Sequence, residues 1–103
     1  MYIVVFITTS SKKEARRIAA RLVENKLAAC VNIIDKVESV FYWQSKIDQA
    51  AEALLVVKTK KSLLNSLIKK VKSWHSYQVP EIIALPIIGG SKEYLDWIDD
   101  STG

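Results

Sequence analysis

The chain has 103 residues, half of them hydrophobic, and its 15 Lys and Arg against 11 Asp and Glu give a net charge of +4. This length suits one domain covering residues 1–103 and is too short for two. A single cysteine, Cys30, excludes an intramolecular disulfide. The sequence has no run of about 18 apolar residues that could span a membrane. We therefore expect a cytoplasmic protein without a membrane partner.

The aromatic content is high for this length, with three Trp, four Tyr and two Phe. A core of this size does not readily enclose so many rings. Part of the aromatic surface is therefore expected to contact a partner, most simply a second copy of the chain. The basic residues are scattered among Glu, Asn and Ser along two predicted helices, without interleaved aromatic side chains. This pattern predicts no nucleic-acid partner.

The first predicted unit is a strand followed by a helix. Residues 2–9 (YIVVFITT) are β-branched or aromatic throughout, which is typical of a buried strand. Ser11 and Glu14 have the spacing of a capping box, which predicts a helix start. Asn25 is the predicted left-handed residue that ends this helix. The predicted core face of the helix comprises Ala15, Ile18, Ala19, Leu22 and Val23.

The next segment consists of two extended runs, at residues 27–34 and 37–43, interrupted by Asp35 and Lys36. They predict either two separate strands or one long strand with a bulge. Cys30 lies in the first run and is expected to be a small buried core residue.

A third extended run, residues 52–59 (EALLVVKT), follows a polar gap at residues 44–49 and predicts another strand. Thr59 is the predicted cap of a second helix. The expected core face of that helix comprises Leu64, Leu67, Ile68 and Val71.

Residues 81–88 (EIIALPII) predict a final strand, and Pro86 places it at a sheet edge or at a bulge. Ser91 is a predicted cap for a last helix with Tyr94, Leu95 and Ile98 on its apolar side. The resulting order, β-α-β-β-α-β-α, predicts an α+β ferredoxin-like βαββαβ sandwich with an extra C-terminal helix. Because the strands are apolar on both faces, association through the uncovered sheet face or the sheet edges is expected.

Five sequence motifs occur in order: LAACVNI (27–33), SVFYW followed by Lys46 (39–46), VVKT (56–59), HSYQVPEI (75–82) and YLDWI (94–98). On these motifs, which run over essentially the whole chain, the sequence resembles the CutA divalent-cation-tolerance family. The resemblance implies a homotrimer of ferredoxin-like subunits without an established enzymatic reaction. It also implies a role in tolerance to copper and other divalent metals, with an unknown downstream protein partner.

The motif around the only histidine supports two readings. In the first, Trp74 closes the apolar face of the second helix, His75 hydrogen-bonds a nearby carbonyl, and Glu81 is a surface charge. In the second, His75 and Glu81 bind Cu(II) or another divalent cation weakly, together with atoms of a second chain. The cleft between subunits is then expected to be lined by Trp43, Lys58 and Tyr77.

The resemblance also shows which copper ligands are missing. Some bacterial members of the family bind copper through a cysteine of the first strand and two adjacent histidines. In this chain the strand position is Ile7 and the adjacent pair reads Trp74-His75, so one of those three ligands remains.

An alternative function from another class is a small-molecule sensor similar to the trimeric PII-type signalling proteins. Its cleft would bind an anionic metabolite or nucleotide, with Lys58 and Lys46 as charge partners. An RNA-recognition module is disfavoured because residues 52–59 contain no aromatic side chain for base stacking. Acylphosphatase-like hydrolysis is disfavoured because all three arginines fall on the first predicted helix.

Overall fold

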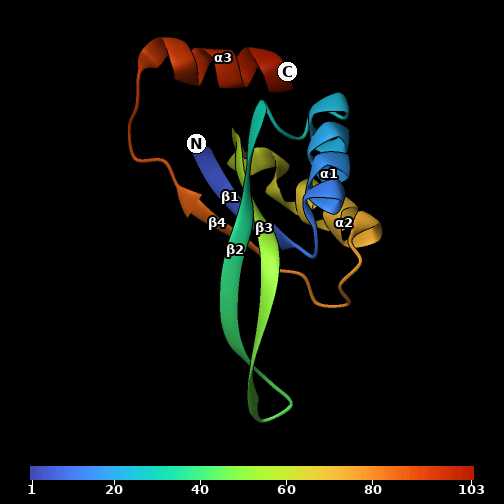
Figure 1. The fold of residues 1–103 in the computed structure, drawn as a ribbon. Coiled ribbons are helices and arrows are strands. Elements are labelled where there is room, and N and C mark those ends of the chain that lie inside the picture. Colours follow the sequence, from blue (N-terminus) through green and yellow to red (C-terminus); the bar gives the residue numbers. More distant parts are fainter.

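Four strands and three helices follow one another in the predicted order in the computed structural model, which describes all 103 residues. The elements are β1 (Tyr2–Thr9), α1 (Lys12–Glu24), β2 (Cys30–Trp43), β3 (Lys46–Lys60), the 3₁₀ turn η1 (Lys61–Leu63), α2 (Leu64–Trp74), β4 (Ile82–Pro86) and α3 (Lys92–Thr102). The strands form one antiparallel sheet in the order β2-β3-β1-β4 (Figure 1). This order confirms the α+β ferredoxin-like prediction. None of the helices combines the length and the apolar character needed to cross a bilayer.

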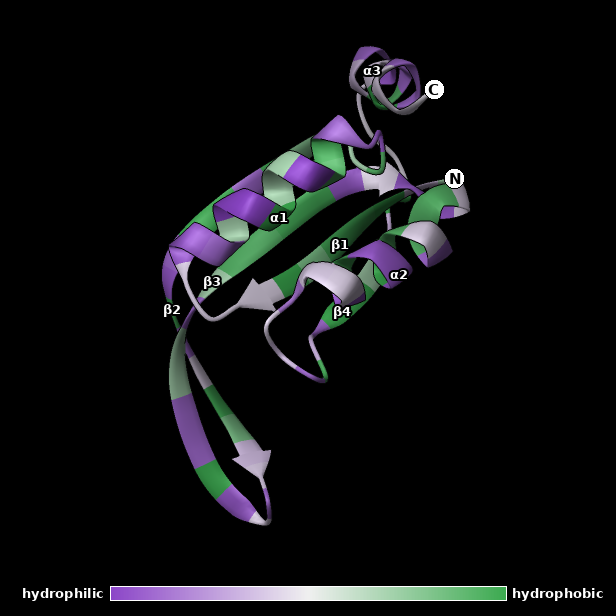
Figure 2. Cartoon of the chain, turned by 90° about the vertical axis from the view of Figure 1, so that its right-hand side faces the viewer, coloured by the Kyte–Doolittle hydropathy of each residue, from purple (hydrophilic) through white to green (hydrophobic).

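The core lies between one face of the sheet and the pair α1 and α2, which cover that face side by side (Figures 1 and 2). Because side chains alternate along a strand, every second residue of β1 and β3 points into this layer. The fully or nearly fully buried core residues include Ile3, Val5, Ile7, Leu55 and Val57 of the sheet and Ala15, Ile18, Leu22, Leu67 and Val71 of the helices. Ile7, the position of the family's missing cysteine ligand, is therefore a core residue.

The opposite face of the sheet has no covering helix layer and is apolar. Val4 is paired with Lys58 and Leu85, and Phe6 is paired with Val56 and Ile83, so these residues share one face. Ile83 and Leu85 are about half exposed, at 54% and 49%. We call Val4, Phe6, Leu54, Val56, Ile83 and Leu85 the open sheet face.

The sequence predicted either two separate strands or one long strand with a bulge in this segment, and the structure has one long strand, β2. It runs as one strand from Cys30 to Trp43, with a register irregularity between Ile34 and Val37, and Lys36 has a positive φ of 60°. The prediction for β3 was wrong at its start, because β3 begins at Lys46 and pairs along its whole length with β2. Gln44 and Ser45 form the two-residue turn, with φ values of 52° and 65°.

The predicted polar gap at residues 44–49 is therefore mostly strand. Apart from Ile47, its residues are polar, because this part of the hairpin extends beyond β1 and is exposed on both faces. We call residues 37–43 and 46–52 the hairpin arm, which projects from the sheet in Figure 1. The arm contributes to the elongated shape of the chain, 45 × 25 × 23 Å.

Three predicted helix ends differ from the structure. Asn25 has a φ of −87°, and the left-handed residue is Lys26, with a φ of 57°. The hydroxyl of Thr59 donates to the carbonyl of Leu27 instead of capping a helix, at 2.7 Å. Ser91 precedes α3, but its side chain makes no capping hydrogen bond.

Helix α3 packs across one end of the sheet. Its Ile98 is fully buried, and its Asp99 accepts a hydrogen bond from the hydroxyl of Tyr2 and lies 3.9 Å from the ammonium of Lys60. The expectation that Cys30 is a core residue was wrong. Cys30 is half-buried on the open sheet side and paired with Lys58 across the strands.

Candidate functional site

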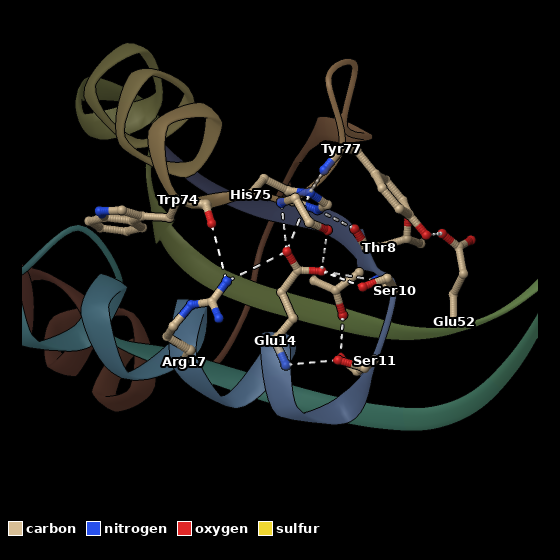
Figure 3. Close-up of polar contacts among 11 residues, drawn as sticks. Thr8, Ser10, Ser11, Glu14, Arg17, Glu52, Trp74, His75 and Tyr77 are labelled. Atoms are coloured by element: carbon tan, nitrogen blue, oxygen red, sulfur yellow. Dashed lines mark hydrogen bonds and ion pairs between the residues drawn. The ribbon is translucent and has the colours of Figure 1, made fainter.

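His75 and Tyr77 of the HSYQVPEI motif lie where β1 ends, between the start of α1 and the end of α2 (Figure 3). We call Ser10, Glu14, Glu52, His75, Ser76 and Tyr77 the Glu14 cluster. Its members come from three stretches of the chain, residues 10–14, Glu52 and residues 75–77. No buried side-chain nitrogen or oxygen of the structure lacks a hydrogen-bond partner.

Glu14 is the centre of this cluster and is only 4% exposed. Its carboxylate accepts hydrogen bonds from the backbone N–H and hydroxyl of Ser76, at 2.7 and 3.0 Å, and from those of Ser10, at 3.0 and 2.9 Å. The guanidinium of Arg17 lies 3.7 Å away. Burial by itself raises the pKa of Glu14, but the hydrogen bonds from Ser76 and Ser10 outweigh it and lower the pKa from 4.5 to about 2.

The predicted capping box is half formed. The hydroxyl of Ser11 accepts from the backbone N–H of Glu14 at 3.1 Å, as expected of a helix cap. The carboxylate of Glu14 does not return to the N–H of Ser11, because it is held by Ser10 and Ser76. The same residue therefore joins the start of α1 to the loop after α2.

His75 has a fully buried side chain, and both of its ring nitrogens are occupied. Nε2 lies 2.7 Å from the carbonyl oxygen of Thr8, which can only accept, so Nε2 carries the proton. Nδ1 then accepts from the backbone N–H of Tyr77 at 3.0 Å. The first reading of the histidine, a hydrogen bond to a nearby carbonyl, is confirmed, and Trp74 packs against the core as expected.

Tyr77 lies beside His75, with the ring centroids 4.9 Å apart, and its hydroxyl donates to the carboxylate of Glu52 at 2.8 Å. Burial and this hydrogen bond to a carboxylate raise the pKa of Tyr77 to about 12. Tyr77 therefore remains a neutral hydrogen-bond donor at physiological pH. It connects the loop after α2 to the beginning of the arm.

The other predicted site residues are not gathered within one chain. Trp43 is at the tip of the arm and 57% exposed, whereas Lys58 is near the far end of β3 and pairs with Val4. Thr8, which binds His75, is four residues along β1 from Val4, about 13 Å at the rise of a strand. Glu81 is exposed in the loop just before the edge strand β4.

Two shallow surface hollows lie on the arm. One is lined by Trp43, Gln44, Lys46, Ile47 and Asp48, and another by Glu38, Gln49, Ala50 and Ala51. A cleft that contains Trp43 together with Lys58 and Tyr77 therefore requires a second chain.

A divalent metal does not fit the residues of a single chain. No group of three or more His, Cys, Asp or Glu side chains lies close enough together to hold an ion. His75 offers no free ring nitrogen, so ligation would require it to leave Thr8 or Tyr77. The assignment of His75 and Glu81 as metal ligands stays a prediction.

Sequence reasoning missed the role of Glu14, Ser76 and Glu52. Glu14 was read as a helix cap only, because its partner Ser76 is 62 residues away in the sequence. The sequence offered one signal for this contact, a short polar pair directly after an apolar element. Ser10-Ser11 follow the first strand, and His75-Ser76 follow the second helix.

With this geometry established, comparison with known proteins shows the family. The family model described as "CutA1 divalent ion tolerance protein" matches residues 3–101. The chain belongs to the CutA1 divalent ion tolerance family. This confirms the resemblance carried by the five motifs, from LAACVNI to YLDWI.

Individual relatives agree with this membership. The divalent-cation tolerance protein CutA of Thermus thermophilus is 49% identical over 100 residues, which cover 97% of each chain. The solved structure of that protein superimposes with a TM-score of 0.98 and covers both chains completely. The periplasmic divalent cation tolerance protein CutA from Archaeoglobus fulgidus, 47% identical, also covers both chains completely with a TM-score of 0.98.

Plant relatives are longer than this chain. The rice protein "CutA 1, chloroplastic" is 49% identical over 97% of this chain, which spans only 56% of the rice protein. Since relatives are named for the chloroplast and for the periplasm, the cytoplasmic location of this protein stays a prediction. The CutA1 family is named for ion tolerance and not for a reaction. The PII-like sensor finds no support among these relatives.

Proposed function

We propose that this protein acts in tolerance of divalent metal ions as a non-catalytic homotrimer. Family membership supports the link to divalent ions. The main observation in favour of a homotrimer is the open sheet face. It presents Phe6, Val56, Ile83 and Leu85 without a covering layer, and burying such a face against copies of the chain is favourable at about 25 cal/mol per Å².

The hairpin arm supports association for a second reason. A two-stranded hairpin is marginally stable in water unless another surface packs against it. Val40, Tyr42, Trp43 and Ile47 of the arm are each more than half exposed, at 68%, 76%, 57% and 71%. An arm that lies on a neighbouring subunit would cover these side chains and bring Trp43 toward the neighbour's Glu14 cluster.

The hydrogen bonds of the single histidine support a non-catalytic role. With Nε2 donating to Thr8 and Nδ1 accepting from Tyr77, His75 is held as a structural group and not as a proton-transfer base. Divalent cations are then bound weakly between subunits, by Glu81 and carboxylates of a second chain. His75 takes part only if it leaves its two partners.

Light scattering tests the assembly, and calorimetry tests the cation. A particle of three times the 11.6 kDa chain mass is expected, whereas a stable single-chain particle contradicts the proposal. Titration with Cu(II) is expected to give weak binding that Glu81→Gln reduces. An isotherm identical for wild type, Glu81→Gln and His75→Ala would remove both residues from the site.

A further inference from the structure

The basic side chains of this chain are concentrated in its helical layer, although they belong to two segments that are far apart in the sequence. The helical layer, defined as α1, η1 and α2, carries nine basic side chains, all exposed, against one exposed and one buried carboxylate, Glu24 and Glu14. The rest of the chain carries six basic and nine acidic residues. The basic residues of the layer are Lys12, Lys13, Arg16, Arg17, Arg21, Lys61, Lys69, Lys70 and Lys72.

The topology turns two separate basic helices into one continuous surface. Both α1 and α2 lie on the same face of the sheet, and Figure 2 shows their hydrophilic turns on the outside. The guanidinium of Arg17 donates to the carbonyl of Trp74 at 3.3 Å, and that of Arg21 lies 5.7 Å above the Trp74 ring. These contacts hold two positive charges of α1 directly beside the end of α2.

We propose that the helical layer binds the phosphate backbone of double-stranded DNA without reading its sequence. Contacts between cationic side chains and phosphates provide this kind of binding and need no groove-inserted element. The sequence alone predicted no nucleic-acid partner because the basic residues seemed scattered. Only the packing of α1 against α2 gathers them.

The composition of the layer distinguishes this partner from others. Val23 is its only exposed large apolar side chain. A protein interface uses buried aromatic or apolar anchors, and a membrane-surface helix inserts an apolar face, which α1 and α2 have already packed against the sheet. Single-stranded nucleic acid is bound by stacking on exposed aromatic rings, which this layer lacks.

The proposed DNA surface is independent of the proposed trimer. The layer lies on the face opposite the open sheet face, so both surfaces are available in one chain or in an assembly. A protein that does not bind DNA could therefore still form a trimer, and a protein that does not form a trimer could still bind DNA.

Fluorescence anisotropy with a labelled duplex of about 20 base pairs and mixed sequence tests the proposal at salt concentrations from about 50 to 200 mM. Wild type is expected to bind in the micromolar range at the lowest salt, with a steep loss of affinity as salt increases. Lys69→Gln/Lys70→Gln/Lys72→Gln is expected to weaken binding by tenfold or more. Its plot of log affinity against log salt is expected to be less steep by about 2 to 3.

The matched control is Lys26→Gln/Lys36→Gln/Lys92→Gln, which removes the same charge outside the layer and is expected to bind almost as wild type. Circular dichroism checks that both variants are folded. Equal loss in both triple variants, tighter binding of a single strand of the same length, or no duplex binding would overturn the proposal. Binding to phosphatidylserine vesicles but not to duplex would also overturn it, in favour of a membrane partner.

Discussion

Ser76 donates two hydrogen bonds to the carboxylate of Glu14, a residue 62 positions earlier, through its backbone N–H at 2.7 Å and its hydroxyl at 3.0 Å. This contact connects the start of α1 to the loop that follows α2. It also explains why a glutamate is buried in a chain with few buried charges: its ionised form is surrounded by donors.

Glu14→Gln is expected to lower the free energy of unfolding by about 3 kcal/mol, because an amide loses the charge-assisted bonds and turns N–H groups toward Ser10 or Ser76. Urea denaturation followed by circular dichroism measures the change. Glu24→Gln is the matched control, since Glu24 is exposed on the same helix and its change should be close to zero. Equal effects of the two substitutions would contradict a structural role for the cluster.

The same contact predicts an acid-sensitive contribution to stability. The pKa of Glu14 is lowered to about 2 in the folded protein from 4.5, so folding is favoured when the group is ionised. The contribution, about 3 kcal/mol, is complete above pH 4.5 and is lost as pH falls from 4.5 toward 2. The difference in unfolding free energy between wild type and Glu14→Gln should therefore shrink over this interval. A difference that stays constant down to pH 2 would count against it.

Tyr77→Phe is expected to destabilise the protein by about 1 to 2 kcal/mol, since the hydroxyl that donates to Glu52 is lost from a partly buried site. The pKa of Tyr77 is raised to about 12, so this stabilisation is present below pH 10 and disappears as pH rises through 12. Ultraviolet titration of phenolate formation should lose one late-titrating group in the variant. If the group lost in the variant is instead one that titrates near pH 10, the contact with Glu52 is excluded.

Val56→Asp is expected to shift the assembly toward single chains, because it puts a carboxylate in the centre of the open sheet face. Light scattering gives the mass, and circular dichroism confirms that the variant is folded. Ala20→Asp makes the same change of charge on the exposed side of α1 and should leave the mass unaltered. A folded Val56→Asp variant with the wild-type mass would mean that the sheet face is not the contact.

The local elements of this protein could be predicted from its sequence because each depends on neighbours in the chain. The β-branched residues 2–9, the helical spacing of Ala15, Ile18 and Leu22, and Pro86 in an edge strand are short-range patterns, and the structure confirms all three. The prediction of a gap at residues 44–49 was wrong because it was based on the polarity of these residues alone. Lys46, Asp48 and Gln49 of the arm are polar and exposed and yet belong to a strand, because their backbone groups pair with β2.

What only the tertiary structure decided is which distant groups meet. Glu14 and Ser76 are brought together by the crossover of α1 and α2 over the same sheet face, and the same crossover joins their basic side chains in one layer. Likewise, Nε2 of His75 is occupied because the fold places the carbonyl of Thr8 beside it. Hydrogen bonds and charge interactions act over a few ångströms in space, and a linear spacing of residues carries no measure of that distance.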